Sequence, residues 1–514
     1  MMGILRTILF AATGLAATGA AFAQQTDSAS LFRTQREHAS PVAALAATAY
    51  ATPALRSEAF AGSLSEISVG YEMRREEKAL EQQKGDGGDF GRFSAGSYKH
   101  ISGKGTVWGD AGYLRGAKRN VVWNASSDYD LVFPYVVADS IGGDLTSEEY
   151  TFGGGYGHRS GRYTWALEAG ARALHEYRDS DPRIRNVAID IDAGAGASVR
   201  MGNYRLGLSA ALRVYKQSGS QIQYAHSAGE KGVYHLSGLG SHYAGFEGNA
   251  NSQTRYRGSG YGLTLALVPD AGRGGLHLAA GYEYLHIEKE LPGSADLVLQ
   301  KVVPRSFHAE AAWLRGSGNG LRWGVALKAR YDYRRGDEGI VDDNNSSQGS
   351  GTLGFLTLFE YSALQGRAEA VFGVEAAGHA WYVCPWGEYR RRTSDYLYPA
   401  QNMEFTRAGG GVDFRCVLQR RSLLLRLEAG GGYTAGLDSG LTLPVADLAA
   451  PLVRMVQYDY GRLRQDAATF RLGLRADYAL RRRMSLFLAE DYGGGLYGDN
   501  TAAHHARVAC GIAF

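Results

Sequence analysis

The side chains in this sequence with the clearest capacity for chemistry are charged residues that alternate with apolar ones. In residues 470–480 every second position is apolar, while Arg471, Arg475 and Asp477 lie between the apolar positions. A β-strand directs successive side chains to opposite faces, so this segment has one apolar face and one charged face. Charged side chains gathered on one face can select a solute, so the first chemistry to consider is electrostatic recognition.

The same alternation recurs along most of the chain, for example in residues 204–214, 276–284, 321–333 and 368–376. One such segment is weak evidence, whereas many segments with charges on a single face strongly predict strands. The charges that we assign to the polar faces, and thus to the inside of the fold, are Glu168, Arg172, Asp190, Asp192, Arg205, Arg213, Glu283, Lys328, Arg330, Asp332, Glu369, Glu375, Arg426, Glu428, Arg471, Arg475, Asp477 and Arg507.

These inward charges have two interpretations. They form a charged pore lining that selects solutes, or a salt-bridged filling that closes the interior. Both arrangements keep the charges away from lipid, where a basic side chain at the midplane would cost about 2–4 kcal/mol. The sequence alone leaves both interpretations open.

Catalytic and metal chemistry have little support. The sequence contains no G-x-S-x-G nucleophile elbow, and His504 and His505 have no serine and acid at a suitable spacing. Glycine clusters at 153–155, 258–262 and 430–432 are followed by no helix pattern and no G-K-[ST], so they indicate strand glycines. No H-x-x-x-H pair suggests a zinc site. We predict a protein that is not an enzyme and has no cofactor or metal.

The elements that position the charges follow an export signal. Arg6 and an apolar run over residues 8–20 precede Ala21-Phe22-Ala23, an A-x-A cleavage site. We expect residues 1–23 to be removed, so that the mature chain begins at Gln24. No later apolar run approaches the roughly 20 residues that a spanning helix needs. If the mature protein lies in a membrane, it must cross it with strands.

Composition favours such strands. Gly supplies 70 of the 514 residues and Pro only 11, which suits tight turns between long uninterrupted strands. The 32 Tyr residues suit aromatic girdles at membrane interfaces. The formal net charge of +3 is too balanced to indicate nucleic-acid binding. We therefore predict an all-β protein, a transmembrane up-and-down antiparallel β-barrel.

Turn signals set the expected number of strands. Eight hairpins are predicted by short glycine-containing or basic junctions at 102–104, 159–161, 202–203, 271–275, 316–320, 365–366, 419–421 and 481–483. Longer polar segments separate these hairpins, including 218–254, 288–304, 385–401 and 437–463. With one further strand at each end, residues 63–514 give about 18 strands, with 16 or 14 as alternatives. Short turns face the periplasm in outer-membrane barrels, so we expect both termini there, in a Gram-negative bacterium.

The chain ends in an alternating strand whose last residue is aromatic. Val508, Cys510, Ile512 and Phe514 share one face. A terminal aromatic after alternating apolar residues resembles the signal that barrel-insertion machinery reads in outer-membrane proteins. The expected partners are therefore that machinery, outer-membrane lipid and a small-molecule solute, without nucleic acid.

Residues 24–62 do not alternate and form a short N-terminal segment before the barrel. Within it, Thr52-Pro53-Ala54 resembles the N-P-A motif that precedes the first strand of fatty-acid-transporter-type barrels, with Thr52 in place of Asn. The segment is either a hatch tucked into the barrel or a periplasmic extension with no plugging role.

Residues 122–144 form an aromatic and acidic loop that is followed by the glycine-rich segment 149–156. Together they resemble a family of Bacteroidota outer-membrane β-barrel proteins known as domain of unknown function 6850, over most of the mature chain. The loop residues of this likeness are Trp123, Asp128, Tyr129, Pro134, Tyr135, Asp139, Gly142 and Gly143. The family has no assigned activity, so the resemblance implies a location and a fold only. The loop is either self-packed or a ligand site at the barrel mouth.

Two functions are consistent with these features. The first is a pore or channel that moves a small solute across the outer membrane, because a barrel of about 16–18 strands leaves an aqueous channel unless it is plugged. The second is a non-transport scaffold or surface-interaction barrel that partners with secretion or uptake machinery through its long loops. An active importer with about 22 strands and a globular plug is disfavoured, because about 500 residues are too few.

Overall fold

The structure is a computed structural model that describes residues 29–222, 233–243, 251–270, 274–292, 297–316, 319–341, 352–444, 450–481 and 483–514. The predicted export signal, residues 1–23, lies outside the described residues. No helix among the described residues is both long and apolar enough to cross a membrane.

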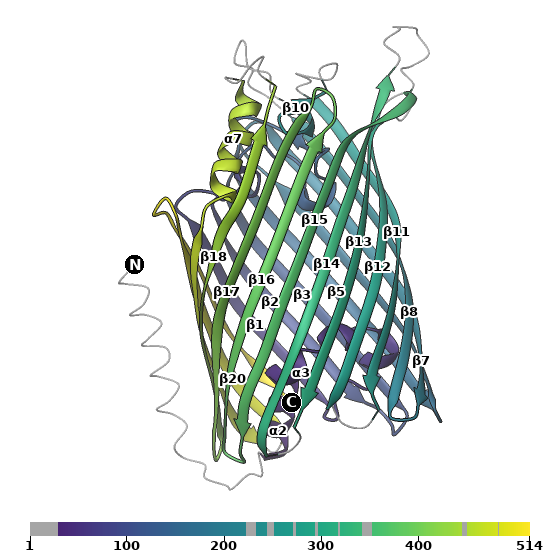
Figure 1. The fold of residues 1–514 in the computed structure, drawn as a ribbon, viewed down its shortest axis with the longest axis vertical. Helices are drawn as coiled ribbons and strands as arrows, with labels where there is room; N and C mark the ends of the chain where they lie inside the picture. Colours follow the sequence, from purple (N-terminus) through teal and green to yellow (C-terminus); the bar gives the residue numbers. More distant parts are fainter. Residues whose placement is uncertain are drawn as a thin grey trace.

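Eighteen antiparallel strands form one closed sheet (Figure 1). Each strand pairs with its neighbour in the chain, and β1 also pairs with β21, which closes the barrel. The strands are β1 (Leu64–Glu76), β2 (Gly87–His100), β3 (Gly105–Val121), β5 (Gly143–Ser160), β6 (Tyr163–Tyr177), β7 (Arg183–Met201), β8 (Tyr204–Ile222), β11 (Asn251–Pro269), β12 (Gly275–Leu291), β13 (Leu297–Arg315), β14 (Gly320–Val341), β15 (Thr352–Glu375), β16 (His379–Tyr396), β17 (Gln401–Arg420), β18 (Leu423–Thr442), β19 (Ala467–Arg481), β20 (Met484–Tyr497) and β21 (Ala502–Ala513). The predicted architecture and strand number are confirmed.

The outer surface of the barrel carries the apolar half of each alternating strand. Leu212 of β8 and Leu327 of β14 have 68% and 65% of their surface exposed. A soluble sandwich would press such side chains together, whereas here they face outward all around the cylinder. The charged half of each strand consequently faces the lumen.

One predicted turn and two predicted loops are wrong. Residues 365–366 lie inside β15, and the short turn falls at residues 376–378. Residues 385–401 are mostly β16, and residues 288–304 are mostly the ends of β12 and β13. Gly366 is a strand glycine on the outer face, and a glycine beside a polar residue imitates a turn in sequence. The strand number is unaffected because the true turn lies only about ten residues away.

A chain of short helices fills the short-turn end of the barrel (Figure 1). These are α2 (Ala29–His38), α3 (Pro41–Ala44), α4 (Ala47–Tyr50) and α5 (Pro53–Arg56). Helix α5 contacts β5 to β8, α4 contacts β11 and β12, and α3 contacts β14. We call residues 29–62 the plug, because they lie across the lumen and touch strands on several sides of it.

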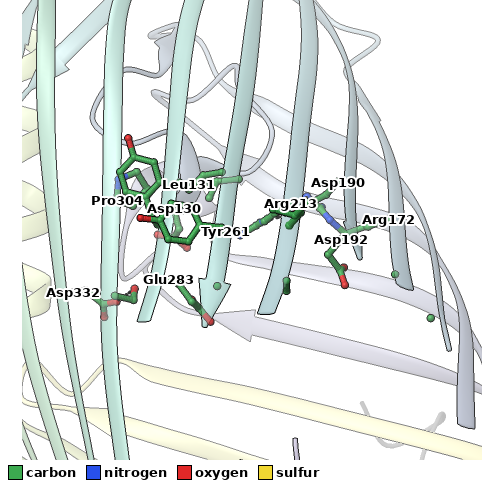
Figure 2. A pocket seen from close by; sticks show the side chains of 18 of the residues that line it. Asp130, Leu131, Arg172, Asp190, Asp192, Arg213, Tyr261, Glu283, Pro304 and Asp332 are labelled. Atoms are coloured by element: carbon green, nitrogen blue, oxygen red, sulfur yellow. Dashed lines mark hydrogen bonds and ion pairs between the residues drawn. The ribbon is translucent and has the colours of Figure 1, made fainter. Parts of the chain in front are cut away.

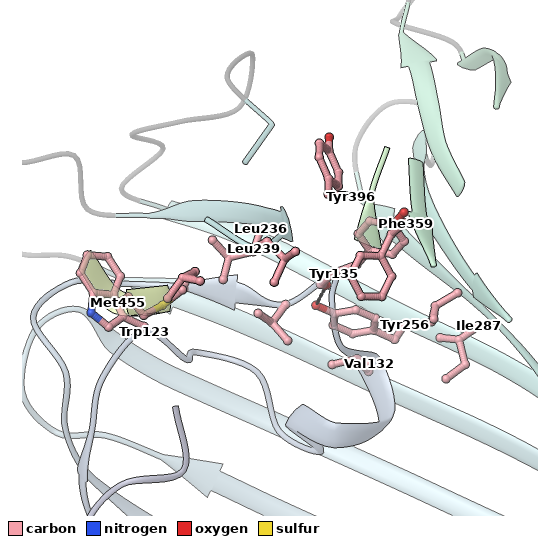
Figure 3. Packing of buried hydrophobic residues seen from close by; sticks show 14 of the residues in the cluster. Trp123, Val132, Tyr135, Leu236, Leu239, Tyr256, Ile287, Phe359, Tyr396 and Met455 are labelled. Atoms are coloured by element: carbon pink, nitrogen blue, oxygen red, sulfur yellow. Dashed lines mark hydrogen bonds between the residues drawn. The ribbon is translucent and has the colours of Figure 1, made fainter. Parts of the chain in front are cut away.

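The long-loop end holds a second folded body, which we call the cap. It comprises residues 122–142, residues 233–243 and α7 (Pro451–Leu463). Its regular elements are α6 (Tyr129–Val132) and a three-stranded sheet of β4 (Val137–Ala138), β9 (Tyr234–Gly238) and β10 (Ser241–His242). A short turn of helix, η1 (Gln82–Lys84), lies beside it. Trp123, Tyr135 and Met455 belong to its buried apolar core, which also packs on the barrel wall (Figure 3).

Asp477 on β19 joins the wall to the plug. Its carboxylate is fully buried and accepts hydrogen bonds from Gln35 Nε2 at 3.0 Å and from Arg475 Nη2 at 2.9 Å. The Arg426 guanidinium lies 3.6 Å away. A buried ion pair is costly to break, because the remaining charge keeps its desolvation cost without its partner.

We therefore expect Asp477→Asn to lower the free energy of unfolding by about 3–5 kcal/mol. Denaturant titration of the detergent-solubilised protein, followed by tryptophan fluorescence, measures this change. Asp491→Asn is the matched control, since Asp491 also faces the lumen but forms no ion pair among the described residues. Equal losses in the two variants would contradict a structural role for Asp477.

Candidate functional site

Polar contacts attach the plug to the barrel wall. Arg205 of β8 reaches Glu58 of the plug at 3.0 Å and Asp270 at 2.8 Å. Thr48 donates a hydrogen bond to Glu310 at 2.6 Å. Further ion pairs join plug arginines to wall glutamates, Arg36 to Glu375 at 4.0 Å and Arg56 to Glu168 at 3.8 Å. Predicted lumen charges therefore anchor the plug as well as line the barrel.

The apolar contacts of the plug are divided among separate clusters. Phe32 and Leu45 pack with β13 to β19, Leu55 packs near β11 and β12, and Ala54 packs near Trp108. The predicted Thr52-Pro53-Ala54 motif starts α5, with Thr52 at the N-cap position. No single apolar core holds the plug in place.

The cap is anchored through Asp128, one of the loop residues predicted from sequence. Its carboxylate accepts hydrogen bonds from Arg172 Nη2 at 2.6 Å and from the Tyr215 hydroxyl at 3.0 Å. Arg172 also lies 3.3 Å from Glu149. A charge-assisted pair of this kind fixes both position and orientation. Asp128 therefore connects the loop to β6 and β8.

A second acid of the same loop is fully buried. Asp139 accepts a hydrogen bond from Arg178 Nη2 at 2.6 Å, and both side chains are almost completely inaccessible. Its other oxygen accepts the backbone N–H of Gly142 at 2.7 Å. Gly142 has a φ of +72°, and a Cβ there would lie 2.8 Å from the Val121 carbonyl oxygen. The turn therefore needs glycine at this position.

The remaining predicted loop residues lie in or beside the cap core. Trp123 and Tyr135 are buried in it, and Tyr129 packs against it. Pro134 follows Phe133, whose ring packs edge-on against Phe359 of β15. Gly143 begins β5. These contacts describe a self-packed loop at the mouth, and Tyr129 and Phe133 also line the cavity below it.

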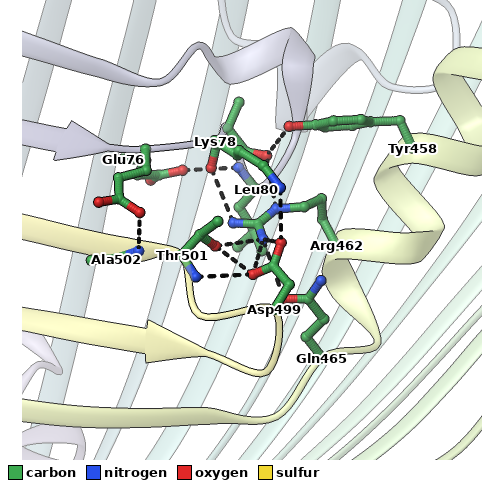
Figure 4. Close-up of polar contacts among 11 residues, drawn as sticks. Glu76, Lys78, Leu80, Tyr458, Arg462, Gln465, Asp499, Thr501 and Ala502 are labelled. Atoms are coloured by element: carbon green, nitrogen blue, oxygen red, sulfur yellow. Dashed lines mark hydrogen bonds and ion pairs between the residues drawn. The ribbon is translucent and has the colours of Figure 1, made fainter.

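Helix α7 fastens the cap to two other loops (Figure 4). Arg462 forms an ion pair with Asp499 at 2.9 Å and donates to the carbonyl oxygens of Lys78 and Ala79. Asp459 accepts hydrogen bonds from Gln82 N at 3.2 Å and Gln83 Nε2 at 2.7 Å. Burial raises the pKa of the Asp459 carboxyl to about 7.

A cavity of about 860 Å³ lies between the plug and the cap. Figure 2 shows Arg172, Asp190, Asp192, Arg213, Glu283 and Asp332 around it. Arg213 forms a two-point ion pair with Asp190, at 2.9 and 2.6 Å. Arg330 and Asp332 form another pair at 2.9 Å. The cavity is therefore strongly polar and holds both signs of charge.

The structure distributes the predicted lumen charges among four environments. Eight residues line this large cavity, namely Glu168, Arg172, Asp190, Asp192, Arg213, Glu283, Arg330 and Asp332. Two further hollows are lined by Arg426, Glu428, Arg471, Arg475 and Arg507. Lys328 lies between Glu310 and Glu369, at 3.8 and 2.7 Å. The contacts of Arg205, Glu375 and Asp477 with the plug are described above.

The sequence patterns missed several cavity residues, among them Asp110, Trp108 and Arg56. Asp110 and Trp108 lie on β3, where glycines and alanines weaken the alternation. The alternating charges of the wall gave no signal for Arg56, because Arg56 belongs to the plug.

Phe514 is half-exposed, and its backbone exchanges hydrogen bonds with Ser65 of β1 at 2.7 and 2.8 Å.

Comparisons with known proteins identify one family. The profile described as "Family of unknown function (DUF6850)" matches residues 53–514. No curated protein matches the sequence.

Solved structures with some likeness include receptors for ferric compounds. They include BauA, the ferric preacinetobactin receptor from Acinetobacter baumannii, with 9% identity, coverage of 88% of this chain and 79% of that chain, and a TM-score of 0.38. The ferric-catecholate import receptor Fiu from E. coli K12 has 8% identity, coverage of 87% and 81%, and a TM-score of 0.37. A mutant of PfeA, the ferric enterobactin receptor from Pseudomonas aeruginosa, has 10% identity, coverage of 88% and 81%, and a TM-score of 0.36.

We expect Asp128→Asn to loosen the cap loop without unfolding the barrel. Asn tolerates the left-handed backbone at this position, where φ is +53°, but loses the charge that Arg172 contacts. Hydrogen exchange over residues 122–142 should quicken about 10- to 100-fold, as expected for lost charge-assisted hydrogen bonds. Asp130→Asn, a change at an exposed acid of the same loop, is the control and should leave exchange nearly unchanged.

The raised pKa of Asp459 predicts a pH-dependent contact between α7 and the loop at residues 82–83. An exposed aspartate ionises near pH 4, so between about pH 4 and 7 the docked helix holds one proton more than the free helix. Docking should therefore weaken as the pH rises through this range and change little above it. Asp459→Asn should abolish the dependence.

A spin label on Arg454→Cys, in a background without the native cysteines, reports the mobility of α7 by electron paramagnetic resonance. Asp499→Asn is the control, because Asp499 has a pKa below its usual range and stays ionised throughout the titration. That variant should loosen α7 equally at every pH. A flat profile in the parent protein would contradict the assignment to Asp459.

Proposed function

The chain belongs to the family of unknown function 6850, whose name assigns no activity, and we propose that it is an outer-membrane barrel that passes a small polar solute through its lumen. The observation that carries this proposal is the polar cavity between the plug and the cap. A lumen filled for stability alone would be packed, because interiors tolerate few voids larger than a water molecule. About 860 Å³ lies within the range of sites for small molecules, roughly 300–1,000 Å³.

The outer face of the barrel supports its placement in a membrane. On β14, Trp323 and Tyr333 lie on the same face as the exposed residues Val325, Leu327 and Tyr331. Ten residues separate Trp323 from Tyr333, and at about 3.3 Å per residue with a tilt of about 40° they are roughly 25 Å apart along the membrane normal. This matches the apolar band of outer-membrane barrels, bounded by aromatic girdles.

The same proposal places the short-turn end and both termini in the periplasm of a Gram-negative bacterium. Short periplasmic turns and longer external loops are typical of such barrels. The resemblance in residues 122–144 supports a Bacteroidota source. Insertion through the terminal strand, read from Phe514, belongs to this proposal as well.

We further propose that the plug, and not the cap, opens the passage. The ion pairs of Arg36 with Glu375 and of Arg56 with Glu168 are partly exposed, and such pairs exchange for water at little cost. The plug's apolar contacts are divided among separate clusters. The cap would have to expose a continuous apolar core, at about 25 cal/mol for each Å² of apolar surface.

A disulfide between plug and wall tests both statements. A Cβ at Gly207 would lie 2.8 Å from Leu55 Cγ, so Leu55→Cys and Gly207→Cys can be bridged. The native free cysteines Cys384, Cys416 and Cys510 are replaced by serine. In planar bilayers the reduced protein should show single-channel steps, and the oxidised protein should show few or none.

Leu55→Cys alone is the matched control and should conduct in both redox states. Equal conductance of the reduced and oxidised double variant would show that the plug is not the gate. Complete silence in every form would favour the second interpretation of the sequence, a scaffold or surface-interaction barrel.

A further inference from the structure

We propose that one wall of the central cavity binds a small organic cation, a guanidinium or amine that also carries a hydrogen-bond-accepting oxygen. The proposal names the substrate class of the proposed transport site and so rests on it. The wall consists of β3, β5, β6 and β7. Its features are two carboxylates over glycines, an indole N–H without a well-aligned acceptor and an arginine of the plug.

Asp110 and Asp192 lean toward each other over a floor of glycine. A Cβ at Gly153 would lie 3.1 Å from an Asp110 oxygen, and a Cβ at Gly170 would lie 2.6 Å from an Asp192 oxygen. Gly153 and Gly170 are register partners on β5 and β6, one strand spacing apart. The two carboxylates therefore flank a shallow space about one strand spacing wide, roughly 5 Å.

Neither carboxylate is neutralised within the fold. Both side chains are exposed to the cavity, and neither forms a hydrogen bond or ion pair among the described residues. On these four strands the cavity is lined by four acids and one base, namely Asp110, Glu168, Asp190, Asp192 and Arg172. Arg172 is already paired with Asp128, and Asp190 with Arg213. The wall thus retains a negative field that favours a cation.

Trp108 supplies an independent indication of a ligand. Its side chain is only 5% exposed and lines the same cavity. Its Nε1 lies near the Glu168 carboxylate but forms no well-aligned hydrogen bond in the part of the chain that the structure describes. A buried N–H with a poorly aligned acceptor is only partly satisfied, and an acceptor oxygen on a bound solute would complete its hydrogen bonding. The ring itself offers a face for cation–π contact.

The plug already places a guanidinium beside this wall. Arg56, the last residue of α5, lies 5.6 Å from the centre of the Trp108 ring and 3.8 Å from Glu168. The wall therefore accommodates a guanidinium without steric conflict. A cationic solute at this wall would compete with Arg56 for Glu168 and Trp108 and so weaken one tie of the plug. Binding and opening would be coupled through this competition.

The occupant is an organic cation and not a metal ion. No group of three or more His, Cys, Asp or Glu side chains among the described residues is close enough to hold a metal. An anion would meet Asp110, Asp192 and Glu168 without a free base on this wall. A neutral polar solute would leave the carboxylate charges uncompensated.

Isothermal titration calorimetry of the detergent-solubilised full chain at low salt tests the inference. The probe is N-acetylarginine amide, and its uncharged isostere N-acetylcitrulline amide is the comparison. We expect the arginine probe to bind at least about tenfold more tightly, as expected for contact with two carboxylates. Asp110→Asn with Asp192→Asn should abolish that preference. Arg56→Ala should tighten binding severalfold, because the internal competitor is gone.

Asp491→Asn is the matched control, since it removes an inward charge on β20 that leans over Gly473 and lines a separate hollow. It should leave binding unchanged. Unshifted strand content by circular dichroism shows that each variant is folded. Absence of binding, equal binding of both probes, or full binding by the double variant would overturn the inference. Because the assay needs no membrane, these outcomes are independent of the conductance result that tests transport.

Discussion

Closure of β1 against β21 is the constraint on which the rest of the structure depends. Eleven residue pairs, from Glu66 with Ala513 to Glu76 with Ala503, join the first strand to the last. An open sheet of this size would leave two edges with unpaired backbone groups, which is costly in water and far more costly in lipid. Once the edges are paired, each alternating strand has a defined inside and outside. The chemistry of the lumen follows from that division.

The charges of the lumen have two roles, stabilising ion pairs and solute recognition, and the two roles fall to different residues. Around Asp477 the charges are paired and buried, and around Lys328 they are paired and partly buried. Hydrogen bonds from Gln35 and Thr48 join these two sites to the plug. Around Asp110 and Asp192 they are exposed and unpaired, and glycines leave space in front of them. A salt-bridged filling and a solute-binding lining can therefore coexist in one barrel. They occupy different heights and walls of the same cylinder.

The two closures of the barrel differ in their physical character. The cap has a continuous apolar core that includes Trp123, Tyr135 and Met455, so its separation from the wall would expose much apolar surface at once. The plug consists of helices of ten residues or fewer, and its apolar contacts with the wall are divided among separate clusters. Short helices have little stability of their own in water. The barrel thus combines one end packed around a continuous apolar core with one end whose contacts are divided among separate sites.

The sequence by itself determined the barrel, the number of its strands and the face on which each charge lies, because strand alternation is a local, two-residue pattern. It misplaced the turn at residues 365–366, since a strand glycine and a turn glycine look alike without their neighbours. It also could not predict the ion pair of Arg56 with Glu168 or that of Asp128 with Arg172. Those residues are 112 and 44 positions apart in the chain. Only the tertiary structure decided these contacts, because they depend on where the plug and the cap lie inside the closed barrel. No local sequence pattern encodes that arrangement.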